Sequence, residues 1–320
     1  MYPDAVTVTA IVITVLGLSL FETVSSVDNA IINAEVLSGM SARGRRWFLL
    51  WGMLFAVFVV RGLLPWVIVW LALPGLGPVG ALLAAFSSDP RVLEAIHGSA
   101  PVLFMGGGVF LVLLFLHWLF LEPKHFGLAG ERFFLSQGIW FYAVAAVYLA
   151  VTVWFAQRVS TSIAFSAVIG STAFFITHGF KQNAEAQERR LMQGALSDAS
   201  KILYLEIIDM TFSIDGVLGA FAFTLSVPLI IVGNGLGAFL VREITIGNLA
   251  RIKRYHYLKN GAMYSILLLG IVMMCDAFGL ETPPWVSPAA TFGIVAFFFL
   301  RSVQEARRGA KPNVPTKEGG

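Results

Sequence analysis

Residues 6–37, VTVTAIVITVLGLSLFETVSSVDNAIINAEVL, begin as an apolar run long enough to enter a bilayer and end in acidic and amide side chains. A helix needs roughly 20 mostly apolar residues to cross a hydrocarbon core of about 30 Å. Ionisable side chains inside such a helix are costly and usually mark a functional site. This stretch therefore predicts a membrane span that carries a polar site.

The same apolar pattern recurs along all 320 residues, of which 57% are hydrophobic and 13% are charged. This composition predicts an all-α polytopic membrane bundle of about nine spans, with one transmembrane domain over residues 1–308 and a disordered cytoplasmic tail over 309–320. The predicted spans are 6–37, 47–73, 100–121, 138–156, 162–180, 202–224, 227–247, 260–279 and 286–300. Between the second and third, SSDPRVLEAIHGS at 87–99 predicts a short external helix that ends at Gly98.

The distribution of positive charge predicts the orientation of these spans. Most of the 22 Lys and Arg residues lie in alternate loops and in the tail after residue 300, which places the N-terminus outside and the C-terminus in the cytoplasm. The pI of about 9.1 is explained by this topology and by anionic lipid, so it indicates no nucleic-acid partner. The first span lacks a basic region before it and predicts no cleavable signal peptide. The single Cys275 excludes an intramolecular disulfide.

An acidic segment occurs twice. ETVSSVDNA at 22–30 aligns with DMTFSIDGV at 209–217, which pairs Glu22 with Asp209, Ser26 with Ser213 and Asp28 with Asp215. Five spans separate the two copies, so they are predicted to run in opposite directions as inverted repeats, about 6–121 and 202–279. Repeats of this kind place a substrate site near the bilayer midplane, often at interrupted helices.

Helical geometry places most of the polar side chains of each copy on one stripe. In the first copy the stripe holds Glu22, Ser26, Asn29 and Asn33, and in the second it holds Asp209 and Ser213 with Glu206 nearby. The two remaining acids, Asp28 and Asp215, lie about 120° off the stripe. We therefore predict an interrupted helix near residues 25–29 and another near residues 213–216, where Gly216 would permit it.

The four carboxylates would together cost on the order of 10 kcal/mol at the bilayer centre without compensation. Protonation, arginine partners or a bound cation could each offset this cost. Oxygen ligands without Cys or His favour hard ions such as Mn²⁺, Mg²⁺ or Ca²⁺. Each acidic segment is followed one span later by an arginine, Arg61 or Arg242, which we interpret as a counter-ion or gating residue, together with the amide Asn234.

The sequence GNGLG at 233–237 lies within an apolar span and lacks the Lys and Ser or Thr of a phosphate-binding loop. Its small residues instead predict close approach of a neighbouring helix, as do Gly106 to Gly108.

Three segments resemble the TerC family of integral membrane proteins, within the LysE-type exporter superfamily. These are SSVDNAIINAEVL at 25–37, IDMTFSIDGVLGAFAFT at 208–224 and GNGLGAFLVR at 233–242. The resemblance implies export of Mn²⁺, as transported substrate, across the bacterial cytoplasmic membrane. It also implies an ion site at Asp28, Asn29 and Asp215, with Glu22 and Asp209 one to two turns before. Gly216 stands where many relatives have Ser. The nine predicted spans are two more than the commoner seven-span members have, which indicates a divergent branch.

The predicted function is therefore a divalent-metal transporter, not an enzyme, that works by proton antiport through Glu22 or Asp209. Two alternatives stay open. Asp28 and Asp215 could form the dyad of an intramembrane aspartyl protease, although the Gly-x-Gly-Asp sequence typical of such enzymes is absent. A non-transporting membrane scaffold is the other. A homo-oligomer is compatible with the sequence.

Overall fold

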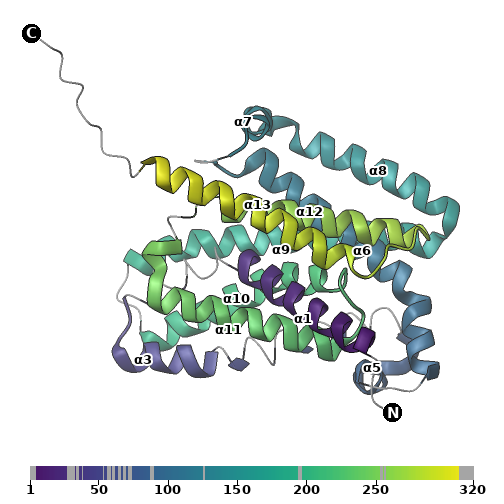
Figure 1. Ribbon diagram of the computed structural model, residues 1–320, viewed down its shortest axis with the longest axis horizontal. Coiled ribbons are helices and arrows are strands. Elements are labelled where there is room, and N and C mark those ends of the chain that lie inside the picture. The colour runs from purple at the N-terminus through teal and green to yellow at the C-terminus, as the bar shows by residue number, and fades with distance from the viewer. Residues whose placement is uncertain are drawn as a thin grey trace, which may run out of the picture.

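The computed structural model describes residues 5–26, 33, 36, 37, 39–52, 54, 55, 59, 62, 63, 66, 67, 70, 74–86, 90–124, 127–193, 197–252, 255 and 257–309. Figure 1 shows the arrangement of its helices. The long helices are α1 (Ala5–Ser25), α6 (Pro90–Leu121), α8 (Phe141–Val159), α9 (Thr161–Gln193), α10 (Asp198–Ala220), α11 (Val227–Ile252), α12 (Leu258–Ala277) and α13 (Val286–Gly309). The short ones are α3 (Ala42–Trp47), a π-helix (Phe48–Gly52), 3₁₀ helices at Pro74–Leu76 and Gly138–Trp140, α5 (Gly77–Ala85) and α7 (Ala129–Ser136).

The predicted fold class, an all-α polytopic bundle, is confirmed. In the described part of the chain six helices are long and apolar enough to cross a membrane, and α11 contributes a shorter apolar segment over Val227–Val241. They correspond to seven of the nine predicted spans. The acids of α10 lower its hydropathy, and most of the predicted second span lies outside the described residues.

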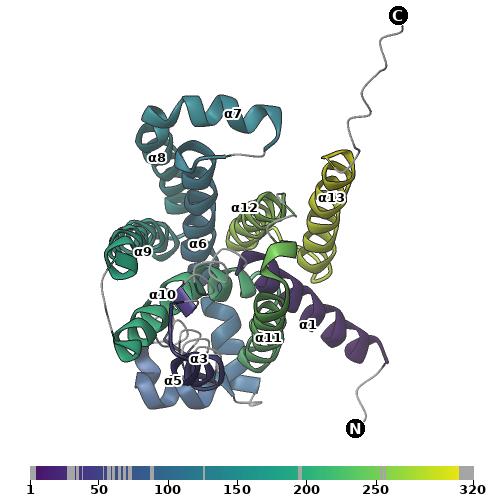
Figure 2. The same cartoon turned by 90° about the vertical axis from the view of Figure 1, so that its left-hand side faces the viewer.

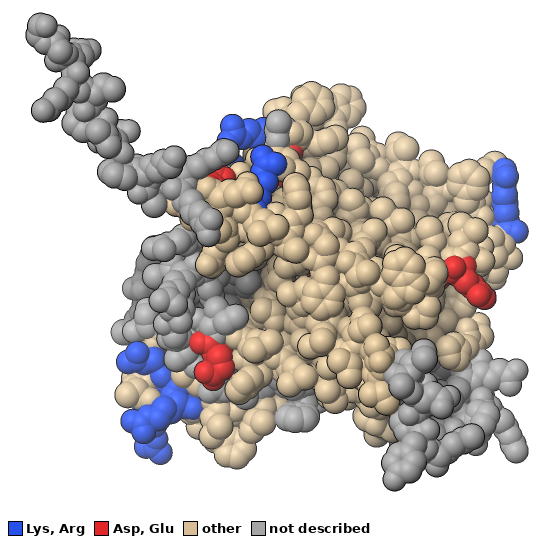
Figure 3. Space-filling model, in the orientation of Figure 1, with Lys and Arg blue, Asp and Glu red and all other residues tan. Residues whose placement is uncertain are grey.

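Charge is segregated on the visible face of the molecule. Figure 3 shows an uncharged band between charged groups at the two ends, and Lys and Arg gather mainly at the end that carries α3 and α7. An uncharged band is what a bilayer core requires, because each exposed charge there costs several kcal/mol. The basic end is the one predicted to be cytoplasmic.

The prediction of a separate external helix before the third span is wrong. Residues 90–121 form one helix, α6, that continues through Gly98. Gly is tolerated inside a helix at a cost of about 1 kcal/mol, so a single Gly does not end one where flanking residues continue the pattern. Pro101 also lies inside α6, and Figure 1 shows the first turns of this helix running at an angle to the rest.

Helix α6 forms the centre of the bundle, and its glycines allow two neighbours to approach closely. A Cβ atom added to Gly106 would lie 3.1 Å from the carbonyl oxygen of Ser166 on α9. One added to Gly108 would lie 2.8 Å from the carbonyl oxygen of Gly270 on α12. Backbones can come this near only where side chains are absent. The predicted role of Gly106 to Gly108 in helix packing is confirmed.

Helices α6 and α9 run in the same direction. Phe110 packs edge-on against Phe174 with ring centroids 5.9 Å apart. Two turns further along α6 and one turn further along α9, the rings of His117 and His178 lie 3.7 Å apart. The inside–outside alternation of loops predicted from positive charge also requires the third and fifth spans to run in the same direction. The Gly and aromatic pairs together fix the half of the bundle that does not contain the acidic segments.

Candidate functional site

The two acidic helices, α1 and α10, cross in opposite directions. Gly17 of α1 lies against Phe223, with an added Cβ only 2.9 Å from its ring. Further along α1, Phe21 meets Gly219, where an added Cβ would lie 2.5 Å from the Phe21 ring. Residue numbers therefore rise along α1 as they fall along α10. This antiparallel crossing is the arrangement expected for the first and sixth spans of an inverted repeat.

Near the C-terminal end of α1, Glu22 is enclosed between two glycines. Its side chain is 1% exposed, and Ser26 Oγ donates a hydrogen bond of 2.8 Å to its Oε1. A Cβ added to Gly216 of α10 would lie 2.6 Å from Glu22 Oε2. One added to Gly237 of α11 would lie 2.6 Å from Glu22 Cβ. The carboxylate thus occupies space that both neighbouring helices leave open by having no side chain.

Helix α11 runs alongside α1 in the same direction. Ser19 Oγ donates to the carbonyl oxygen of Gly233 at 2.9 Å, and one turn later Thr23 Oγ1 donates to that of Gly237 at 3.4 Å. These hydroxyls hold the two backbones together where a larger residue would separate them. The predicted packing role of residues 233–237 is confirmed. Sequence reasoning missed Ser19 and Thr23, although Ser19 lies one turn before Glu22 on the polar stripe.

The predicted interruption of the second acidic helix is wrong. Helix α10 is continuous from Asp198 to Ala220, and Ser213 Oγ donates within it to the carbonyl oxygen of Asp209 at 2.6 Å. Gly216 is needed for close approach to Glu22 rather than for a backbone break. Asp215 and Asp209 are half-buried, and both have interaction partners.

The predicted interruption of the first acidic helix, near residues 25–29, lies mostly outside the described residues and stays a prediction. Helix α1 stops at Ser25, and the amide of Ser26 still bonds the carbonyl oxygen of Glu22 at 3.0 Å. Asp28 and Asn29 lie outside the described residues, as does Arg61. Their predicted contribution to the site stays a prediction.

Glu206 lies away from Glu22. It is ten residues before Gly216 on the same helix, which corresponds to about 15 Å along the axis. It adjoins Gly52 of the π-helix, and neither carboxylate oxygen has a hydrogen-bond partner among the described residues. The structure therefore brings Glu22 and Ser26 to the α10 segment that carries Ser213, Asp215 and Gly216, and leaves Glu206 in a separate position.

Asn234 is another buried polar residue whose side chain has no hydrogen-bond partner among the described residues. It lies on α11 one turn before Gly237, is fully buried, and neither its Nδ2 nor its Oδ1 is hydrogen-bonded in the described part of the protein. A buried amide left unpaired costs roughly 1–3 kcal/mol. Arg242 lies two turns further along the same helix, and the structure describes its backbone but not its side chain.

The described side chains do not by themselves assemble a metal-binding cluster. Among the residues that the structure describes, no group of three or more His, Cys, Asp or Glu side chains is placed to hold a metal ion. At the crossing of α1 and α10, the Glu22 carboxylate and the Ser26 hydroxyl supply oxygen atoms 2.8 Å apart. A hard cation bound there would need further oxygen ligands, and the undescribed Asp28 and Asn29 follow Ser26 directly in the chain.

Comparison with known proteins places the chain in a family. The profile of the family described as "Protein of unknown function (DUF475)" matches residues 27–309, which is most of the chain. The "Uncharacterized membrane protein YceF" of Bacillus subtilis (strain 168) is 30% identical over 82 residues, covering 26% of this chain and 32% of that relative. The match thus spans about a third of the relative's length. No solved structure matches significantly.

These matches support a family of membrane proteins, and the resemblance to TerC stays a prediction from the three motifs. With its apolar helices, the protein is a multi-pass membrane protein. Because the family profile covers far more than half of the sequence, the chain belongs to the DUF475 family.

Proposed function

We propose that this protein transports a hard divalent cation, Mn²⁺ as the favoured substrate, through a site between α1, α10 and α11. The observation that carries the proposal is the fully enclosed Glu22, held at the antiparallel crossing of two matching acidic segments. Ionisable side chains buried within membrane-spanning segments are costly and commonly mark ion pathways. The TerC resemblance agrees with this assignment.

Proton antiport supplies the coupling in this proposal. Export of a divalent cation against a cytoplasm-negative potential costs about 2.3 kcal/mol per charge per 100 mV, so an energy source is required. Glu22 is the proposed proton carrier: its Oε1 accepts a hydrogen bond from Ser26, and its Oε2 lies beside Gly216 of α10. The proposed setting is the bacterial cytoplasmic membrane, with the N-terminus outside and the C-terminus in the cytoplasm.

The test is metal flux in proteoliposomes of purified protein. Glu22→Gln and Asp215→Asn are expected to abolish Mn²⁺ flux, while Glu281→Gln, an exposed acid after α12, retains it. Asp28→Asn tests the undescribed part of the site in the same assay. Wild-type flux in Glu22→Gln would refute the site.

Selectivity and coupling are measured on the same vesicles. We expect transport of Mn²⁺, weaker transport of Mg²⁺ or Ca²⁺, and none of Zn²⁺, because the proposed ligands are oxygens. An imposed pH gradient should drive Mn²⁺ uphill in wild-type vesicles. Flux that ignores the gradient would remove the antiport step and leave the cation site standing.

A further inference from the structure

The short helix α7 lies across the bundle rather than along it. Figure 1 shows it nearly end-on while the long helices run across the view, and in Figure 2 it extends sideways above the ends of α6 and α8. It joins these two spans within the predicted cytoplasmic loop 122–137. A helix in this position lies roughly parallel to the membrane plane, at the level where one span ends and the next begins.

The inner face of α7 is fixed to the bundle. Glu131 is 1% exposed, and its Oε2 accepts a hydrogen bond of 2.8 Å from Asn260 Nδ2 on α12. Phe134 packs edge-on against Phe120 of α6 with ring centroids 5.3 Å apart. These contacts hold one side of α7 against α6 and α12, so the opposite side must face outward.

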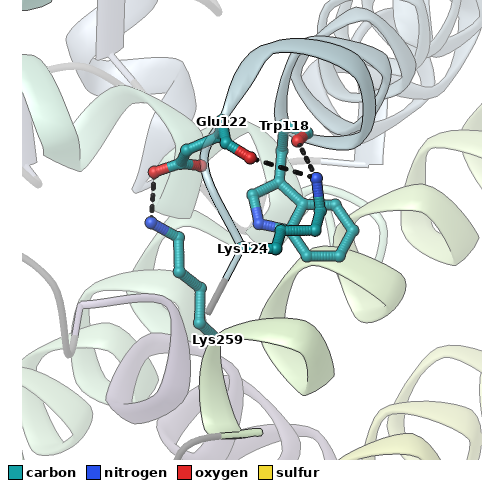
Figure 4. Close-up of polar contacts among 4 residues, drawn as sticks. All are labelled: Trp118, Glu122, Lys124 and Lys259. Carbon is teal, nitrogen blue, oxygen red and sulfur yellow. Dashed lines mark hydrogen bonds and ion pairs between the residues drawn. The ribbon is translucent and has the colours of Figure 1, made fainter. Parts of the chain in front are cut away.

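The residues directly after α6 are also held in place. Lys124 donates to the carbonyl oxygens of Trp118 and Leu119 at 2.6 and 2.9 Å, which closes the C-terminal end of α6. Glu122 in turn pairs with Lys259 at the start of α12, as Figure 4 shows. The described residues before α7 are therefore anchored to the ends of α6 and α12.

The exposed large side chains of α7 and of the 3₁₀ helix Gly138–Trp140 that follows it are apolar and aromatic. Phe133 of α7 is 63% exposed, and Ile139 and Trp140 of the 3₁₀ helix are 87% and 59% exposed. Arg132 is exposed beside Phe133. Large apolar side chains that remain uncovered in a folded protein indicate a surface that another phase or molecule covers.

That surface is continuous with a face that lipid must cover. Helix α8 begins at Phe141, directly after Trp140, and exposes Tyr142, Val147 and Trp154 along its length. Because α8 is an apolar span, hydrocarbon covers these side chains, and the aromatic residues near its start belong at the interface. The occupant of the α7 face is therefore the adjoining headgroup region of the same leaflet.

We propose that α7 and the 3₁₀ helix that follows it form an interfacial segment whose exposed side chains, those of Arg132, Phe133, Ile139 and Trp140, lie in the headgroup region, and that this segment binds anionic phospholipid through Arg132. The aromatic and aliphatic side chains enter the acyl boundary to a depth of about 5–10 Å, as amphipathic helices do. The guanidinium is then level with the phosphates. Through Asn260, Glu131 connects this lipid-contacting helix to α12 at the centre of the bundle.

The depth of α7 can be measured by site-directed spin labelling. In a Cys275→Ser background, nitroxides are placed at Phe133→Cys, at Val147→Cys in the exposed middle of α8, and at Ser200→Cys in the exposed first turn of α10. In lipid nanodiscs we expect the label at 133 to be accessible to oxygen and shielded from a water-soluble nickel chelate, at a shallower depth than at 147. Chelate access equal to that at 200 would overturn the proposal. Spin–spin broadening between copies would also overturn it, in favour of a protein contact.

The lipid class is tested by the charge of residue 132. Thermal midpoints in nanodiscs with and without phosphatidylglycerol give the preference of each variant for anionic lipid. Arg132→Gln should lower the affinity for anionic lipid about fivefold, because one basic residue near an anionic surface contributes that much to binding. The rise in thermal midpoint caused by phosphatidylglycerol should therefore be smaller in Arg132→Gln and unchanged in Arg132→Lys. An unchanged preference in Arg132→Gln would refute the role of Arg132. Both variants change an exposed side chain, so folding is retained.

Discussion

The glycine opposite Glu22 on α11 offers the sharpest test of the packing described above. A Cβ at Gly237 would lie 2.6 Å from Glu22 Cβ and 2.7 Å from the carbonyl oxygen of Ser19. The second of these atoms is backbone and cannot move without shifting α1. Overpacking of this kind costs about 1–3 kcal/mol, and the higher helix propensity of Ala returns up to about 1 kcal/mol. We therefore expect Gly237→Ala to destabilise the protein by about 2 kcal/mol.

Gly216→Ala should behave differently, because its added Cβ meets only the end of the Glu22 side chain. Contact with Oε2 at 2.6 Å can be relieved by rotation of the carboxylate, so we expect little change in stability. The rotation would disturb the bond from Ser26, and transport should fall. Glu22→Asp removes the contact with the carboxylate in Gly216→Ala, whereas in Gly237→Ala the contacts with Glu22 Cβ and the Ser19 carbonyl oxygen remain, so the loss of stability should persist there.

The assay is thermal unfolding of purified protein in one detergent, followed by fluorescence, with Mn²⁺ flux measured in parallel. Gly293→Ala on α13 is the matched control, because no atom lies within 4 Å of its added Cβ. It should be as stable as the wild type or slightly more so. If Gly237→Ala unfolds at the same temperature as Gly293→Ala, then α1 and α11 are not as close as the structure places them.

Three further predictions follow from single contacts. Asn234→Leu removes a buried amide that has no partner among the described residues, so thermal unfolding should show equal or greater stability while Mn²⁺ flux is lost; a variant that transports normally would show that the amide has no role. Lys124→Met keeps the apolar stem and loses the bonds to the end of α6, and should cost about 1–2 kcal/mol in thermal unfolding. The loss should exceed that of Lys201→Met, which removes the hydrogen bond to the carbonyl oxygen of Gly39; equal losses would contradict the capping role. Hydrogen bonds from Ser41 hold the pKa of Asp198 below its usual value, so the stabilising effect of this carboxylate is present at neutral pH and is lost as the pH falls through that lowered pKa. The difference in thermal midpoint between wild type and Asp198→Asn should therefore shrink on acidification, and a constant difference would refute the stabilising role of these bonds.

Some features followed from local pattern and were predicted correctly. Apolar runs of span length indicate where helices cross a membrane. Backbone N–H and C=O groups left unpaired in hydrocarbon cost several kcal/mol, and a helix pairs these groups within itself. The small residues at 233–237 indicated close helix approach, and α1 lies directly against Gly233 and Gly237. The repeated acidic segment predicted opposite directions, and α1 and α10 do cross in that way.

Other features depend on partners that sequence spacing does not reveal. Gly98 and Gly216 suggested a helix end and an interruption, yet both lie inside continuous helices. A glycine permits either a break or a close contact, and only the neighbour decides which occurs. For Gly216 the neighbour is Glu22, which is 194 residues earlier in the sequence and cannot be identified from the local pattern of α10.

The sequence alone therefore determined that this chain is a helical membrane protein with acids inside its spans, because hydropathy and charge are properties of each segment by itself. The tertiary structure decided which acid is enclosed. Glu22 is buried at a three-helix contact where α10 and α11 each present a glycine. Glu206 lies beside Gly52, about 15 Å from Gly216 towards the start of α10. Burial depends on the distances between helices, and these are set only when the helices pack.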